Sequence, residues 1–163
     1  MADELLAAAL AAIGRKERTE AEMHQWLDER EAAPEEAERV MAYLVENLAV
    51  DDQRFANGFA EDKRRLSGWG QDRIESALFT RGVPRELISA ALESGQGESE
   101  VDRATRVLLE KDSVLDDDRG RQRALALLAR RGFGAEDAYA AIRRAAREGR
   151  DSQAPASRSL GGH

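Results

Sequence analysis

The chain has 163 residues, carries 25 Lys and Arg against 32 Asp and Glu for a net charge of −7, and contains no Cys. This length fits one compact domain or a short array of small units, and the lack of Cys excludes disulfides, a thiol nucleophile and Cys-ligated zinc. The longest apolar run, Leu5–Ile13, is far shorter than the roughly 20 residues of a membrane span, and no export signal is recognisable. We therefore expect a cytoplasmic protein that makes no membrane contact.

The first part of the chain, residues 1–49, predicts three helices, over about 3–14, 20–30 and 35–48. Apolar residues recur at helical spacing in each of them. Thr19-Glu20-Ala21-Glu22 is a capping box, in which the Thr and Glu side chains each accept from the other's backbone N–H, so it starts the second helix. Pro34 lies where a first-turn proline is tolerated, so the third helix begins there.

Residues 50–97 repeat this plan, with helices expected over about 53–66 and 71–80 and a third that opens at Pro84. Asp51 or Asp52 can cap the first of these helices. Gly68-Trp69-Gly70 interrupts the pattern before the second helix, and Gly82 is expected to end that helix in a left-handed conformation.

Residues 98–148 form the third unit, with helices near 98–111, 118–131 and 135–148, and residues 149–163 are expected to be a flexible tail. The segment Leu78–Val83 matches Leu128–Phe133 at a spacing of 50 residues, and Leu27–Arg30 matches at 51, with Glu31 in place of the glycine. Repeats of this length are typical of helical arrays. We therefore predict an all-α protein of three tandem three-helix repeats that form an elongated array.

The charge is distributed unevenly along these three units. Residues 1–49 carry 5 cationic and 12 anionic side chains, net −7, whereas residues 98–148 carry 11 of each. The third unit is rich in Arg. Such a polarised chain suits a partner that is itself polarised, or nucleic acid near one end only.

The sequence offers little chemistry for catalysis, a cofactor or a metal. His24 has no apparent nucleophile or metal-ligand companion, and Gly68-Trp69-Gly70 lacks the third glycine and the preceding strand of a dinucleotide site. Asp116-Asp117-Asp118 lacks the alternating ligands of a calcium loop, so we interpret it as a helix cap. Trp26 is expected in the core, and Trp69 packs or stacks on a base. We expect a protein that is not an enzyme and holds no cofactor or metal.

Five short segments, in order, resemble the RecX family, the regulatory proteins of the bacterial recombinase RecA. Each is weak alone, but together they cover roughly residues 5–145. They are Arg18–Glu22, Val50–Ala56, Gly68-Trp69-Gly70 with Arg73-Ile74, Leu78–Val83 and Arg130-Arg131-Gly132-Phe133.

The resemblance implies an all-helical modulator that binds RecA filaments on single-stranded DNA. It implies that the protein limits filament growth and inhibits the ATPase, strand-exchange and co-protease activities of RecA. It therefore also implies a role in homologous recombination, DNA repair and the SOS response. The expected partner is the RecA filament, with single-stranded DNA contacted weakly or indirectly, and the expected state is a monomer.

Partner contact is expected from exposed arginines, chosen by charge density and helix position. The candidates are Arg64, Arg65, Arg73 and Arg81 in the second unit and Arg123, Arg130 and Arg131 in the third. Two alternatives stay open. One is a nucleic-acid-binding helical-repeat module that acts through its Arg-rich C-terminal unit, against which the net charge of −7 argues. The other is a helical-repeat scaffold for a different partner.

Overall fold

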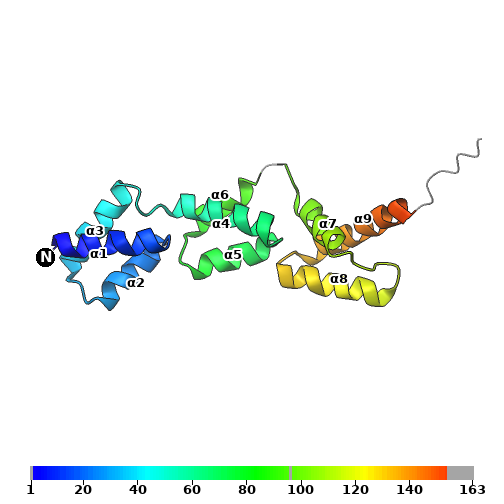
Figure 1. Cartoon of the computed structure of the whole chain (residues 1–163), viewed down its shortest axis with the longest axis horizontal. Coiled ribbons are helices and arrows are strands. Elements are labelled where there is room, and N and C mark those ends of the chain that lie inside the picture. Colours follow the sequence, from blue (N-terminus) through cyan, green and yellow to red (C-terminus); the bar gives the residue numbers. More distant parts are fainter. Residues whose placement is uncertain (1, 96, 154–163) are drawn as a thin grey trace, which may run out of the picture. The chain divides into compact units, whose positions relative to one another are not determined.

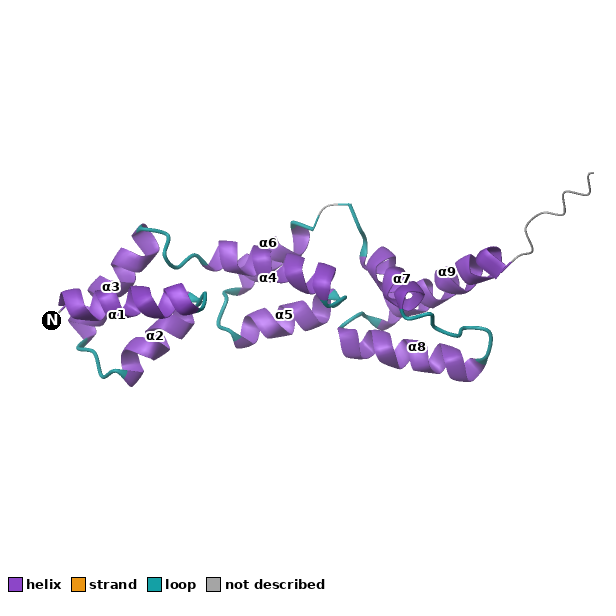
Figure 2. Ribbon diagram, viewed as in Figure 1, coloured by secondary structure: helices purple, strands orange, loops and turns teal. Residues whose placement is uncertain are grey.

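The computed structural model describes residues 2–95 and 97–153, and within these residues it contains nine α-helices and no strand (Figures 1 and 2). The predicted all-helical class is therefore confirmed. The helices are α1 Ala2–Arg15, α2 Glu20–Glu29, α3 Pro34–Glu46, α4 Asp52–Leu66, α5 Gln71–Thr80, α6 Arg85–Glu93, α7 Glu100–Glu110, α8 Asp118–Arg131 and α9 Ala135–Gln153.

The chain divides into two compact units. Unit 1 contains residues 2–65 and 74–95, and unit 2 contains residues 66–73 and 97–153. Helices α1 to α4 except its last residue, most of α5, and α6 belong to unit 1, whereas α7, α8 and α9 belong to unit 2. The division into three repeats of about 50 residues stays a prediction. Residues 154–163 of the predicted tail lie outside the described residues, and residues 149–153 continue α9.

Helices α1, α2 and α3 share one apolar core. It contains Met23, Trp26 and Leu27 of α2 together with Val40, Met41 and Leu44 of α3. The capping box is formed as predicted: the Thr19 hydroxyl accepts from the Glu22 N–H at 3.1 Å, and the Glu22 carboxylate accepts from the Thr19 N–H at 2.9 Å. Trp26 is 8% exposed, so its predicted place in the core is confirmed.

The next three helices bury a second set of small and branched side chains. The buried residues are Phe55, Ala56, Ala60, Ile74, Leu78, Val83, Ile88 and Ala91. Asp51 caps α4, since its carboxylate accepts from the Arg54 N–H at 3.1 Å.

Helix α9 packs along α7 and also against α8, around a core rich in Ala. Asp117 is the N-cap of α8 and accepts from the Gly120 N–H at 2.7 Å, which confirms the capping interpretation of the triple aspartate. A second capping box, Ser99 with Asp102, starts α7 and was not predicted from the sequence.

Five helices of the described chain end in the same left-handed turn. Gly82 and Gly132 have φ of +84° and +95°, Glu31 at the matching position has φ of +53°, and Leu48 and Asp112, which follow α3 and α7, have φ of +58° and +49°. In each turn this residue's N–H donates to the carbonyl three residues back and the next N–H to the carbonyl five back from it, the Schellman arrangement. The left-handed end predicted at Gly82 is confirmed, and Gly132 ends α8 in the same conformation. Glu31, Leu48 and Asp112 adopt it although they carry side chains.

Candidate partner-binding surfaces

Arg81 lies at the centre of a junction within unit 1, between α2, α4 and α5. Its carbonyl accepts from the Thr19 hydroxyl at 2.7 Å, and its guanidinium donates to the Glu22 carboxylate at 2.7 and 3.1 Å. The same guanidinium reaches the Glu17 carbonyl at 3.4 Å. Asp52, the first residue of α4, completes the junction by accepting from the N–H of Glu20, the first residue of α2, at 2.9 Å. We call this set the first junction.

Unit 2 contains a second junction with the same plan. The Arg131 carbonyl accepts from the Gly70 N–H at 2.7 Å, and the Arg131 guanidinium donates to the Ser67 carbonyl at 2.6 Å. Glu100, the first residue of α7, accepts from the N–H of Gln71, the first residue of α5, at 2.8 Å. Each junction arginine thus bonds a carbonyl 64 residues earlier in the chain. In each junction a carboxylate from the second helix further along the chain accepts from the first N–H of a helix, a group that has no partner within its own helix.

The glycine after each junction arginine is required by a close approach as well as by its backbone angle. A Cβ at Gly82 would lie 2.4 Å from the Ala21 Cβ, and one at Gly132 would lie 2.3 Å from the Arg73 Cβ. The repeated Arg-Gly pair in the sequence therefore builds a junction, with the arginine as its hydrogen-bonding centre and the glycine as the point of contact.

Four of the seven candidate arginines are engaged within the protein. Arg81 and Arg131 form the junctions, and Arg64 is 8% exposed and donates to the Leu92 carbonyl at 2.7 Å. Arg73 is exposed, but its guanidinium lies 4.0 Å from the centre of the Trp69 ring and donates to the Arg130 carbonyl at 3.2 Å.

The other three candidates point toward solvent. Arg65 is exposed and makes one long ion pair, 3.7 Å, with Asp62. Arg123 and Arg130 are exposed on α8, and together with Lys111 they line one groove in unit 2. The structure brings these two arginines together, and sequence reasoning missed Lys111 because it is a single cation at the end of a different helix.

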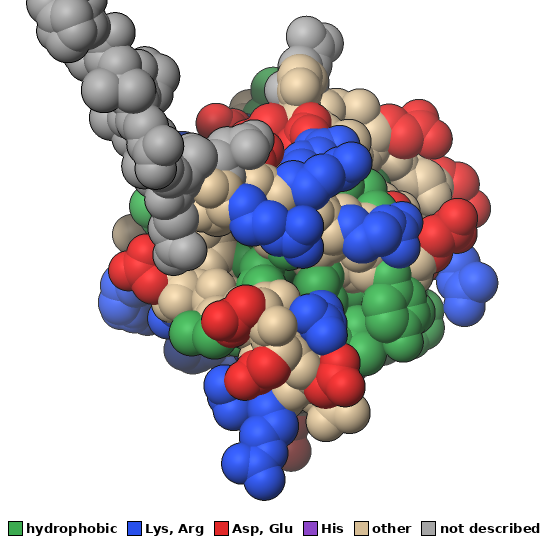
Figure 3. All heavy atoms as spheres, turned by 90° about the vertical axis from the view of Figure 1, so that its right-hand side faces the viewer, with side chains coloured by type: hydrophobic (Ala, Val, Ile, Leu, Met, Phe, Trp, Pro, Cys, Tyr) green, Lys and Arg blue, Asp and Glu red, His purple; other side chains and the backbone are tan. Residues whose placement is uncertain are grey.

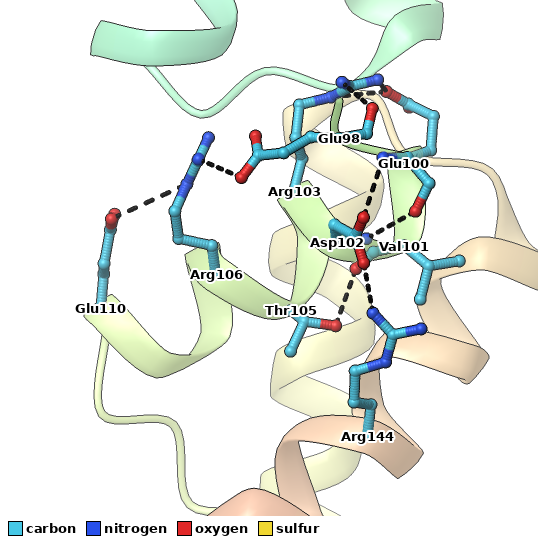
Figure 4. Close-up of polar contacts among 10 residues, drawn as sticks. Glu98, Glu100, Val101, Asp102, Arg103, Thr105, Arg106, Glu110 and Arg144 are labelled. Atoms are coloured by element: carbon cyan, nitrogen blue, oxygen red, sulfur yellow. Dashed lines mark hydrogen bonds and ion pairs between the residues drawn. The ribbon is translucent and has the colours of Figure 1, made fainter. Parts of the chain in front are cut away.

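Three further arginines, two on α7 and one on α9, form ion pairs with carboxylates at or just before the start of α7 (Figure 4). Arg106 pairs with Glu98 at 2.6 Å, Arg144 pairs with Asp102 at 2.5 Å, and the buried Arg103 pairs with Glu100. The backbone and hydroxyl of Ser99 and the Arg144 guanidinium hold the pKa of Asp102 below its ordinary value. These cations are structural, so the arginine content of this unit overstates the charge left for a partner.

Carboxylates also gather at the start of α9. Burial, together with the negative charges of Glu100, Glu136 and Asp72, raises the pKa of Asp137 above its ordinary value. Several Lys and Arg side chains lie close together in the upper part of the face drawn in Figure 3, with Asp and Glu side chains around them.

The described residues do not assemble a metal centre. They contain no group of three or more His, Asp and Glu side chains placed to hold a metal ion. His24 is exposed on α2, and His163 lies outside the described residues. None of the helices in the described chain is both long and apolar enough to cross a membrane.

These features define an all-helical protein in which hydrogen-bonded junctions connect helices within each unit. Comparison with known families places it further: the model of the RecX first three-helix domain matches residues 6–44, and that of the RecX second three-helix domain matches residues 51–92. The chain belongs to the RecX family.

Curated relatives agree with this assignment, and a solved structure shares the fold. A regulatory protein RecX of Deinococcus radiodurans is 37% identical over 145 residues, which cover 88% of this chain and 69% of the relative. A regulatory protein RecX of Mycobacterium sp. (strain JLS) is 31% identical over 131 residues, which cover 76% of this chain and 72% of the relative. The crystal structure of RecX from Lactobacillus salivarius superposes with a TM-score of 0.79 at 16% identity, covering 89% of this chain and 96% of that one. At this low identity, the similarity to that structure shows the fold alone.

Proposed function

We propose that this protein regulates the RecA recombinase by binding RecA filaments on single-stranded DNA. In this proposal it limits filament growth and thereby lowers ATPase, strand-exchange and co-protease activity, as a cytoplasmic monomer without enzymatic activity of its own. The observation that carries the proposal is family membership over most of the chain, since the curated relatives are named regulatory proteins RecX.

The junctions support a binding role. A protein that binds along another macromolecule must keep its contact surfaces in fixed positions, because every group ordered on binding costs conformational entropy. In both junctions, backbone groups and a capping carboxylate hold neighbouring helices together before any partner arrives.

The exposed arginines are the proposed contacts with the partner. Arg65, Arg123 and Arg130 are exposed, and Arg73 presents a guanidinium that is already ordered on Trp69. Arg64, Arg81 and Arg131 are assigned to the fold instead, because their hydrogen bonds within the chain would be lost if they turned outward.

The test is ATP hydrolysis by RecA of the same organism on single-stranded DNA, titrated with this protein. Inhibition at well below one molecule per RecA subunit is the expected result, because a molecule bound to a filament affects several subunits. Full ATPase activity at an excess of this protein and at low salt would contradict the proposal. The double variant Arg65→Glu/Arg73→Glu is expected to inhibit less, and the variant Glu75→Lys/Glu86→Lys, which changes exposed charges of the opposite sign, serves as its control.

A further inference from the structure

A groove of about 300 Å³ in unit 2 lies between the end of α7, the segment that follows it and α8. Its volume is at the lower end of the range of small-molecule sites in proteins. Eight residues line it: Lys111, Ser113, Val114, Gly120, Arg123, Ala124, Leu127 and Arg130.

Three of the lining side chains are cations, and no lining residue is a carboxylate. Lys111, Arg123 and Arg130 are all exposed. Within the described part of the chain, none of the three side chains makes an ion pair, whereas Arg121 on the same helix pairs with Asp118 at 2.6 Å. Concave surfaces lined by one sign of charge concentrate the field and raise the local concentration of the opposite charge. The groove is therefore suited to an anion.

Its remaining lining is largely apolar. Ala124 is buried, Leu127 is half-buried, and Val114 is 55% exposed. Ser113 adds a hydroxyl that can donate to an anionic oxygen. A ligand that fits this lining has negative charge at the cations and a flat or apolar part against Val114 and Leu127.

We propose that this groove binds the sugar–phosphate backbone of single-stranded nucleic acid, with one base against the apolar wall. Arg and Lys are the usual phosphate contacts of proteins, and binding without sequence preference combines a cationic groove with surfaces that take base faces. The identity of the ligand rests on the proposed function, which brings the protein to single-stranded DNA. Arg119, one turn before Arg123 on α8 and exposed, extends the cationic surface beyond the groove.

The test is direct binding of the full chain to a short fluorescent oligothymidylate without RecA, followed by anisotropy between about 50 and 200 mM salt. For a single strand the logarithm of the binding constant changes with the logarithm of salt by about −0.7 per phosphate contact. Three contacts predict a slope of about −2, and the variant Arg123→Gln/Arg130→Gln is expected to reduce the slope by about 1.4. The matched control is Arg143→Gln/Arg147→Gln, which removes two exposed cations of α9 outside the groove and is expected to leave the slope nearly unchanged.

Val114→Ser tests the apolar wall. It is expected to weaken binding several-fold without a change in slope, because it removes a base contact and no charge. Circular dichroism checks the fold of each variant, and Lys111→Gln, at the end of α7, provides a separate removal of a groove cation from another element.

Three outcomes overturn the proposal: no binding of the oligonucleotide, equal losses in the groove and α9 variants, or tighter binding of an oligoglutamate peptide than of the oligonucleotide. RecA ATPase inhibition measured with the same proteins separates this site from the proposed function. Inhibition that persists while oligonucleotide binding is absent rejects the groove alone, and oligonucleotide binding without inhibition rejects the regulation of RecA.

Discussion

The Arg81 guanidinium donates two hydrogen bonds to the Glu22 carboxylate, with Nη2 2.7 Å from Oε1 and Nε 3.1 Å from Oε2. The same carboxylate accepts from the Thr19 N–H in the capping box of α2, and the guanidinium lies 4.4 Å from the centre of the Phe55 ring on α4. One arginine thus connects α5 with α2 and α4. A two-point contact of this kind is more directional than a single ion pair.

Arg81→Ala is therefore expected to destabilise unit 1 by about 1–3 kcal/mol, because it removes charge-assisted hydrogen bonds at a partly buried site and leaves Glu22 without its cation. Urea unfolding followed by circular dichroism measures the loss. The control is Arg65→Ala, whose exposed pair with Asp62 is 3.7 Å long and is worth well under about 1 kcal/mol. Equal stability of the Arg81 variant and the wild type would mean that Arg81 does not stabilise the fold. Arg81 would then again be a candidate for partner contact.

The acid sensitivity of unit 1 depends on Glu22. Burial disfavours its charge, but the contacts with Arg81 and Thr19 outweigh burial and hold the pKa of Glu22 below its ordinary value of 4.5. A carboxyl group whose pKa is lowered in the folded state contributes stability that is present above the unfolded-state pKa and is lost as the pH falls through the folded-state pKa.

Glu22→Gln is expected to lower the free energy of unfolding at neutral pH and to flatten its fall below about pH 4.5. Urea unfolding of the variant and the wild type across this range provides the measurement. The exposed Glu29, at the end of the same helix, offers the control variant Glu29→Gln, for which a nearly parallel pH curve is expected. A Glu22 variant that loses stability with acid as steeply as the wild type would show that the ion pair is not the cause.

Glu31 occupies a left-handed turn at the position where the matching turns after α5 and α8 have glycine. Its φ of +53° costs an L-residue with a side chain roughly 1–2 kcal/mol, and part of this cost is offset because glycine gains entropy in the unfolded chain. Since Glu31 is exposed, Glu31→Gly is expected to raise the free energy of unfolding by about 0.5–1 kcal/mol. Thermal unfolding followed by circular dichroism checks the sign. Gln25→Gly, at an exposed position inside α2, is expected to have the opposite effect, and a loss of stability in both variants would contradict the strain argument.

The helices could be predicted closely because their starts and ends are encoded by local chemistry. Thr19 with Glu22, Pro34 and Gly132 each mark a boundary that the structure places within a residue or two. The partners of the arginines could not be predicted, because Arg81 and Glu22 are 59 residues apart in the chain and only the packed helices bring them together.

The burial of Arg64, in contrast, could have been predicted from the sequence. It follows Ala56 and Ala60 at intervals of four residues, and both alanines are buried, so the helical period places Arg64 on the same face. Charge density had favoured exposure instead. Lys111 carried no comparable signal, because its place beside Arg123 depends on how the end of α7 meets α8.

The second junction offers a test in unit 2 at Gly132. An added methyl group would lie 2.3 Å from the Arg73 Cβ and 2.5 Å from the Arg73 backbone nitrogen, and φ is +95°. Both the clash with backbone and the left-handed angle oppose a side chain, so Gly132→Ala is expected to cost about 2–4 kcal/mol. Gly134→Ala is the matched control two residues further on, since its Cβ would meet nothing within 4 Å and is expected to change stability by about 0.5 kcal/mol or less. Urea unfolding of both variants provides the comparison. Equal effects at the two positions would mean that the close contact between Gly132 and Arg73 does not stabilise unit 2.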